Sequence, residues 1–132
     1  MLKRLIFIIL SLNILCLNNL YSQDYNEEEQ NPPIDIPIIK AIAEDDINTL
    51  KNIINSGEDL EIRDEQGNTP LIWAALYGNF DIVRELINAN VNINNTNNFG
   101  NTALMGAVLE GHYSTIKLLL DNKANINTTN ND

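Results

Sequence analysis

A period of 33 residues is the feature that most constrains the fold of this chain. The stretch from Asp64 to Asn97 recurs one period later, and the identical pairs include Gly67 and Gly100, Thr69 and Thr102, Leu71 and Leu104, Ala74 and Ala107, Gly78 and Gly111, Leu86 and Leu119, and Asn92 and Asn125. A weaker copy lies one period earlier and begins near Pro37. A fixed period of this size indicates stacked structural units, each of which contacts only its neighbours.

The second unit resembles an ankyrin repeat. The residues that carry the resemblance are Asp64-Glu65-Gln66-Gly67-Asn68-Thr69-Pro70-Leu71, then Ala74-Ala75, Gly78 and the apolar positions of Ile82-Val83-Arg84-Glu85-Leu86-Ile87. The resemblance extends from Ile36 to Thr129 and implies an all-α ankyrin-repeat solenoid of helix-turn-helix units with short β-turn or hairpin connections. It places the repeats at about residues 37–63, 64–96 and 97–129, with a degenerate first repeat.

Local signals predict two short helices in each unit. Thr69 and Thr102 are the predicted N-caps of first helices, and Asp46 is the predicted N-cap of a second helix. Gly78 and Gly111 permit the positive φ that ends a first helix tightly. Helices of eight or nine residues are unstable alone in water, so stacking must hold them. The predicted contacts between units set Leu71, Ile82, Val83, Leu86 and Ile87 against Leu104, Ile116, Leu119 and Leu120.

The sequence departs from the family pattern at several positions. The histidine that usually follows Pro-Leu is Ile72 in one unit and Met105 in the next, so the hydrogen bond it makes to the neighbouring turn is expected to be absent. Trp73 and Gly106 occupy equivalent positions, which predicts either a large residue packed against a small one or ordinary core variation. No polar capping unit follows the third repeat, so Ile116 and Leu120 are expected to be exposed.

The N-terminal stretch predicts export. Lys3 and Arg4 precede an apolar run from Leu5 to Leu17, which is shorter than the roughly 20 residues needed to span a bilayer. Residues 1–22 are therefore interpreted as a cleaved secretory signal, and residues 23–36 as an acidic, proline-containing linker. An uncleaved anchor and a lipid-modified Cys16 are the alternatives. The expected destination is the periplasm, the cell envelope or the medium.

Charge and side-chain inventory narrow the function. The net charge is −10, and residues 24–65 carry 13 acids against three bases, which disfavours nucleic acid and favours a basic partner or serves solubility. His112 is the only histidine, and it stands where ankyrin repeats commonly have one between their helices. No histidine pair, cysteine-histidine pair or fixed acidic cluster supports catalysis or metal binding. We therefore expect no enzyme activity, no cofactor and no metal site.

The resemblance implies a protein-binding module whose contact surface is formed by turn tips and the open face of the first helices. Carried over to this sequence, the candidate partner-binding residues are Arg63, Glu65, Gln66, Asn68, Leu76, Tyr77, Thr96, Asn98, Phe99, Asn101, Leu109 and Glu110. The alternative for the large apolar members is that they pack on one another. An alternative function is a structural subunit that associates with itself through its uncapped C-terminal repeat.

Overall fold

The computed structural model describes residues 36–131. The predicted signal segment and all of the predicted linker except Ile36 lie outside these residues. Three helix pairs follow one another: α2 (Pro37–Ala43) with α3 (Ile47–Ser56), α4 (Pro70–Tyr77) with α5 (Phe80–Asn88), and α6 (Ala103–Leu109) with α7 (Tyr113–Asp121). The only β element in this part of the chain is an isolated antiparallel bridge between Thr96 and Thr102. The predicted all-α repeat fold is confirmed.

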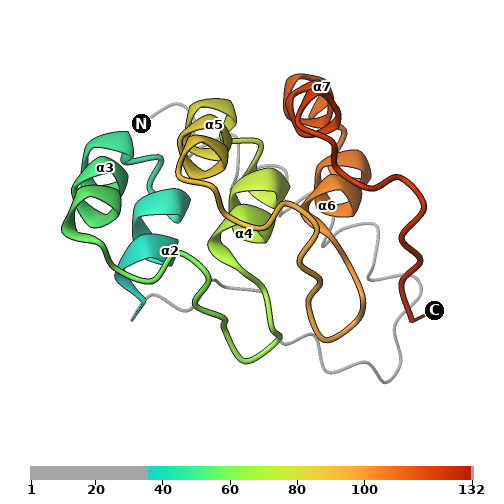
Figure 1. Cartoon of the computed structure of the whole chain (residues 1–132), viewed down its shortest axis with the longest axis horizontal. Coiled ribbons are helices and arrows are strands. Elements are labelled where there is room, and N and C mark those ends of the chain that lie inside the picture. The colour runs from blue at the N-terminus through green and yellow to red at the C-terminus, as the bar shows by residue number, and fades with distance from the viewer. Residues whose placement is uncertain (1–35, 132) are drawn as a thin grey trace, which may run out of the picture. The chain divides into compact units, whose positions relative to one another are not determined.

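The helices form two layers (Figure 1). The first helices of the pairs, α2, α4 and α6, lie side by side in one layer, and the second helices, α3, α5 and α7, form the other. The loops between successive pairs project from the open side of the first layer. Each pair therefore contacts the pair before it and the pair after it, as a solenoid requires.

The predicted helix ends are confirmed. The Thr69 and Thr102 hydroxyls accept hydrogen bonds from the N–H groups of Ile72 and Met105, both at 3.3 Å. These bonds satisfy N–H groups that have no partner within the helix. Gly78 and Gly111 have φ values of +68° and +72° at the ends of α4 and α6. Asp45 stands at the equivalent place after α2 and also adopts positive φ, at +54°.

Asp46 caps α3 through its carboxylate, which accepts hydrogen bonds from the N–H groups of Asn48 and Thr49, each at 3.1 Å, and from the Thr49 hydroxyl at 2.6 Å. The bond from the Thr49 hydroxyl, followed by the bond from the Thr49 N–H, lowers the pKa of Asp46 below its ordinary value of 3.8. The ionised carboxylate is thus favoured in the folded chain.

Replacing Asp46 with alanine is expected to lower the melting temperature at neutral pH, because α3 loses its cap. A carboxyl whose folded pKa is depressed stabilises the fold above pH 3.8 and loses this contribution as pH falls below that value. The difference between Asp46→Ala and wild type should therefore shrink on acidification through this range. Circular dichroism melts across pH check it, and a difference that stays constant with pH would contradict it.

The core runs through all three pairs. Its largest fully buried side chains include Ile39, Ile42, Leu50, Ile82, Val83, Leu86 and Leu119, and Ala74, Ala75 and Ala107 allow the helices to approach closely. Ile87 and Ile116 are half-buried, and Leu120 is exposed. The prediction that Leu120 packs between units is therefore wrong, and the prediction that it is exposed is confirmed, whereas Ile116, which was also expected to be exposed, is half-buried. It faces outward, and no fourth helix pair covers it among the described residues.

The suggested pairing of Trp73 with Gly106 is also wrong. A Cβ atom added to Gly106 would lie 3.1 Å from the Leu76 side chain, so Leu76 is the residue that uses the space. Trp73 instead donates a hydrogen bond from its indole Nε1 to the Asp64 carboxylate at 2.7 Å. Gly106 does leave room for a large neighbour, but that neighbour is Leu76, which lies one helical turn beyond Trp73 in α4.

Candidate protein-binding surface

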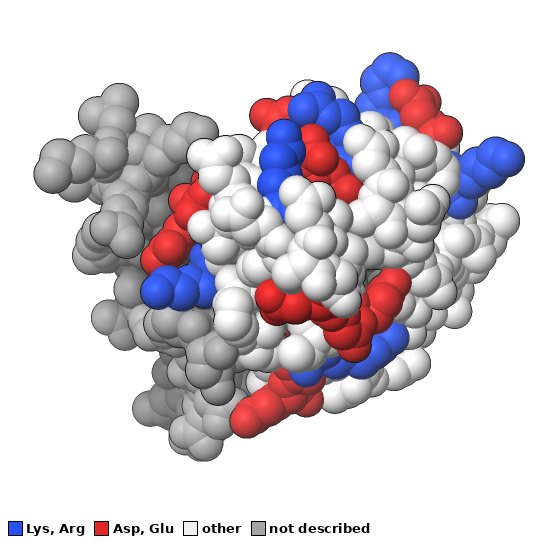
Figure 2. All heavy atoms as spheres, turned by 60° about the vertical axis from the view of Figure 1, so that its left-hand side comes forward, with Lys and Arg blue, Asp and Glu red and all other residues white. Residues whose placement is uncertain are grey.

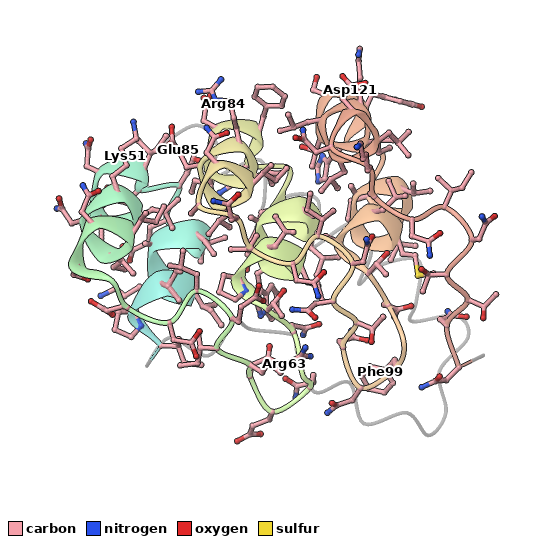
Figure 3. All side chains as sticks on the ribbon, viewed as in Figure 1. Lys51, Arg63, Arg84, Glu85, Phe99 and Asp121 are labelled. Atoms are coloured by element: carbon pink, nitrogen blue, oxygen red, sulfur yellow. The ribbon has the colours of Figure 1, made fainter. Side chains whose placement is uncertain are left out.

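The loops at residues 57–69 and 89–102 and the tail at 122–131 form what we term the turn edge of the array. Figure 3 shows Arg63 and Phe99 at this edge, and Lys51, Arg84, Glu85 and Asp121 on the second helices at the opposite side. The opposite side carries ion pairs between Lys51 and Glu85 at 3.5 Å and between Lys117 and Asp121 at 2.6 Å. The Lys117–Asp121 pair is exposed and the Lys51–Glu85 pair is partly exposed, so both remain in contact with solvent and contribute little stability.

Arg63 links two turns. Its guanidinium Nη1 donates to the carbonyl of Gly67 at 3.1 Å and to the carbonyl of Thr96, in the next turn, at 2.7 Å. A charged donor makes a stronger hydrogen bond than a neutral one. Arg63 is therefore both an exposed residue of the candidate surface and a positioning residue for its backbone.

Asparagines join each turn to the one before it by a bond that repeats with the period of the sequence. The Asn98 side chain donates to the carbonyl of Glu65 at 3.0 Å, and the Asn98 N–H donates to the carbonyl of Gln66 at 2.9 Å. One period later, the Asn131 side chain donates to the carbonyl of Asn98 at 3.1 Å, and its N–H donates to the carbonyl of Phe99 at 2.9 Å. We call this series the asparagine ladder.

A second series connects the loops closer to the helices. Glu61 accepts hydrogen bonds from the Asn92 N–H at 2.6 Å and the Asn95 side chain at 2.7 Å. One period later, the Asn94 side chain accepts from the Asn125 N–H at 2.8 Å. The high asparagine content therefore has a structural role that the sequence pattern did not reveal.

His112 connects the second and third pairs. Its ring Nε2 lies 2.9 Å from the Leu76 carbonyl, and the ring packs against Gly78, where an added Cβ would lie within 2.6 Å of ring carbons. At the preceding junction, the Asn79 side chain donates to the Ile42 carbonyl at 2.7 Å. His112 therefore has a structural role, because it links the second and third helix pairs. These two bonds and the asparagine ladder supply links between repeats that the missing family histidines do not.

Asp64 organises the base of the second turn from a buried position. Its carboxylate accepts from the Asn68 N–H at 2.8 Å, the Asn68 side chain at 3.0 Å and the Trp73 indole at 2.7 Å. The Asn68 side chain also accepts a bond from Asn97 at 2.9 Å. Asn68 is therefore buried and fully engaged, so its expected place on the contact surface is wrong. Tight turns expose some of their polar residues and bury others to satisfy backbone groups.

The remaining candidates divide by exposure. Exposed members are Arg63, Glu65, Asn98, Phe99, Leu109 and Glu110, and half-buried members are Gln66, Leu76, Tyr77, Thr96 and Asn101. The exposed fraction of Phe99 is 54%, and it is the exposed aromatic side chain of the turn edge, which also exposes the aliphatic side chains of Ile62 and Ile126. Glu65 and Asn98, on adjacent turns, are exposed polar neighbours in the ladder that holds it. An apolar anchor on a rigid, polar surround is typical of an interaction hot spot.

Leu76 and Tyr77 are less available. Leu76 packs over Gly106, and the Tyr77 ring stacks on Trp73 with centroids 5.8 Å apart. Burial raises the pKa of the Tyr77 hydroxyl above its ordinary value of 10.0, so this group stays neutral near neutral pH. These two residues are engaged within the array, but their partners are Gly106 and Trp73 and not other members of the candidate set.

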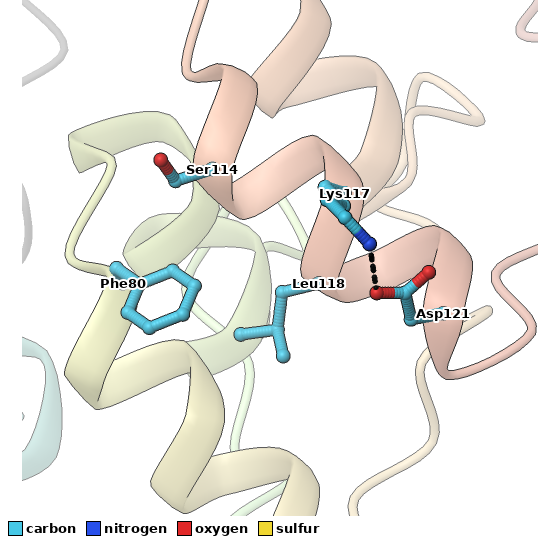
Figure 4. A pocket seen from close by; sticks show the side chains of 5 residues that line it. All are labelled: Phe80, Ser114, Lys117, Leu118 and Asp121. Carbon is cyan, nitrogen blue, oxygen red and sulfur yellow. Dashed lines mark hydrogen bonds and ion pairs between the residues drawn. The ribbon is translucent and has the colours of Figure 1, made fainter.

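A shallow cavity of about 590 Å³ lies between α5 and α7, away from the turn edge (Figure 4). Phe80 and Leu118 form its apolar part, and Ser114 and the Lys117–Asp121 pair form its polar part. Its residues do not include a converging set of donors or acceptors beyond that ion pair. Residues 36–131 also contain no cluster of three histidine, cysteine or acidic side chains that could hold a metal ion. Within the same range, every helix is too short or too polar to cross a membrane.

Comparison with known proteins agrees with this architecture. The family model described as ankyrin repeats, three copies, matches residues 38–130. The chain belongs to the ankyrin repeat family. No curated protein matches it.

Among solved structures, the chain is similar to a chain in the complex of the Bd0816 predatory endopeptidase from Bdellovibrio bacteriovorus with the immunity protein Bd3460. The two are 37% identical with a TM-score of 0.66, and the match covers 69% of this chain. It covers 48% of the other chain, so this chain spans about half the length of the relative.

Proposed function

We propose that this chain is a non-catalytic ankyrin module that binds a protein through its turn edge. The observation that carries the proposal is the exposure of Phe99 at the tip of a turn that Asn98 and Asn131 hold in place. A preorganised apolar anchor loses little conformational freedom on binding, which favours affinity. The ring Nε2 of His112, the single histidine of the chain, lies 2.9 Å from the Leu76 carbonyl, where it links two repeats.

An endopeptidase is the partner class we propose. A similar chain occurs in a complex formed by an endopeptidase and an immunity protein, and the sequences share 37% identity. On this proposal the chain binds a peptidase and limits its action. The acidic first repeat would speed encounter with a basic surface on the peptidase.

We also propose export as the setting of this function. Lys3 and Arg4 ahead of the apolar run from Leu5 to Leu17 support a secretory signal, and a signal cleaved near Ser22 would leave residues 23–132. Mass spectrometry of the chain recovered from culture fluid and from envelope fractions tests this. Recovery of a full-length chain from the cell interior would contradict export.

The binding proposal predicts that Phe99→Ala weakens partner binding by at least about tenfold, because truncation of an interface anchor costs about 2 kcal/mol. Residues 23–132 serve as bait in extracts of the producing cell, with captured peptidases identified by mass and tested for inhibition by the bait. Titration with the purified peptidase then gives the affinity.

Tyr113→Ala is the matched control, because it truncates an exposed aromatic residue that lies on α7 and away from the turn edge. It should leave the affinity of a single chain for the purified peptidase unchanged. Equal loss of affinity in both variants, or binding that survives Phe99→Ala, would refute the turn edge as the contact surface. Capture of a non-peptidase through Phe99 would retain the surface and refute the partner class.

A further inference from the structure

The two ends of the helix array differ in chemistry. Large apolar side chains are exposed on the third repeat at Val108, Leu109, Tyr113, Leu120 and Ile126, and we call this set the C-terminal end face. Their equivalents one period earlier are more covered: Val108 is 57% exposed where Ala75 is 0%, and Tyr113 is 84% exposed where Phe80 is 36%. The third repeat covers the second, and nothing in residues 36–131 covers the third in the same way.

Contacts of the second repeat show the direction in which this face points. Leu76, the equivalent of Leu109, packs over Gly106 of the third repeat. Phe80, the equivalent of Tyr113, lines the cavity that it shares with Ser114 and Leu118 of α7. Because the units repeat, the C-terminal end face points along the array, away from the second repeat.

The opposite end is polar. Lys40, Thr49 and Asn52 are exposed there, at positions where the second repeat has Trp73, Ile82 and Glu85. Figure 2, which brings the first-repeat end forward, shows basic and acidic side chains beside one another over this region. Among residues 36–131 the apolar end face has no apolar counterpart at this end, so head-to-tail stacking of copies is disfavoured.

The distribution of charge also favours contact between two third repeats over head-to-tail stacking. Residues 97–131 carry two acids, Glu110 and Asp121, and two bases, Lys117 and Lys123, so the third repeat is neutral. Residues 36–65 carry eight acids and three bases. Two copies therefore repel least when their third repeats meet and their acidic first repeats lie far apart.

The available area fits a weak interface. The five exposed side chains offer an apolar surface on the order of 500 Å², which is as large as the largest patch on a typical monomer and at the low end of what one partner contributes to a specific contact. We propose that two copies of this chain associate across a two-fold axis through their C-terminal end faces. Phe99 and the loops at 57–69 and 89–102 do not belong to this face, so such a dimer presents two partner-binding surfaces and gains avidity toward a clustered partner.

Light scattering with size-exclusion chromatography on residues 23–132, over concentrations up to about 1 mM, tests the dimer. All helices and all core contacts described above lie within these residues. The wild-type mass is expected to rise from one chain toward two and to stop there, because a two-fold contact closes on itself. A chain that stays monomeric throughout, or whose mass continues past two, would overturn the proposal.

Two variants locate the contact without disturbing the helix. Tyr113→Glu places an acid in the first turn of α7, and Leu120→Lys places a base in its last turn, so both charges agree with the helix dipole. Both variants are expected to remain monomeric with unchanged circular dichroism. If either variant is folded and still dimerises like wild type, the end face is not the contact.

Asn52→Glu is the matched control at the opposite end, and Phe99→Ala is the control on the turn edge. Both should dimerise like wild type. Loss of the dimer in Asn52→Glu would indicate head-to-tail association and overturn the two-fold arrangement. Because Phe99→Ala affects partner binding and Tyr113→Glu affects self-association, failure of the dimer is distinguishable from failure of the proposed function.

Discussion

Gly78→Ala is expected to lower the free energy of unfolding by about 2–4 kcal/mol, because two costs add at this position. Gly78 has a φ of +68°, a conformation that disfavours any residue with a Cβ atom. The added Cβ would also lie within 2.6 Å of carbons of the His112 ring. The ring would have to move and its contact with the Leu76 carbonyl would be lost. Urea unfolding monitored by circular dichroism measures the change.

Gly111→Ala is the matched control for this prediction. Gly111 has nearly the same φ, +72°, but its added Cβ meets nothing within 4 Å. Only the backbone cost of about 1 kcal/mol should remain. If the two substitutions destabilise the chain equally, contact with His112 contributes nothing, and the proposed link between the second and third repeats is wrong.

Asp64→Ala is expected to destabilise the chain by about 3 kcal/mol, because it leaves buried donors of Asn68 and Trp73 without an acceptor. A neutral truncation at an exposed polar site would cost far less. The fluorescence of the chain's single tryptophan reports the same event, since the Trp73 indole loses its hydrogen bond. Chemical unfolding followed by fluorescence and by circular dichroism gives both readings.

A double-mutant cycle with Trp73→Phe isolates the bond between the indole and the carboxylate. Trp73→Phe removes one donor, so Asp64→Ala should cost less in that background, by about 1 kcal/mol or more. Asn97 occupies the equivalent position in the third repeat but is only half-buried, so Asn97→Ala should cost less than Asp64→Ala. Additive costs in the cycle would contradict a direct interaction.

The helices and their ends were predictable because they depend on local chemistry. A Thr directly before Pro-Leu or Ala-Leu is a preferred helix N-cap, and a glycine after a short apolar helix permits the left-handed turn. Because the units repeat, each signal occurs twice at equivalent positions, Thr69 with Thr102 and Gly78 with Gly111, which strengthens both predictions. The same logic correctly placed Asp46 at the start of α3.

Contacts between neighbouring repeats were not predictable from local chemistry. Trp73 and Gly106 are equivalent in sequence, yet the side chain that fills the space at Gly106 is Leu76, one helical turn beyond Trp73 in α4. Asparagine gave no sequence signal, because its amide can donate to a carbonyl of any neighbouring turn. Asn68 was assigned to the surface for a similar reason, although the buried Asp64 carboxylate draws its side chain inward.

The asparagine ladder bears on how such an array can grow by duplication of its gene segment. Asn131 makes the bonds to the third turn that Asn98 makes to the second. A copied block of 33 residues inserted in register would therefore bring its own connector and find an acceptor already in place. The number of repeats can thus change without a new type of contact between turns.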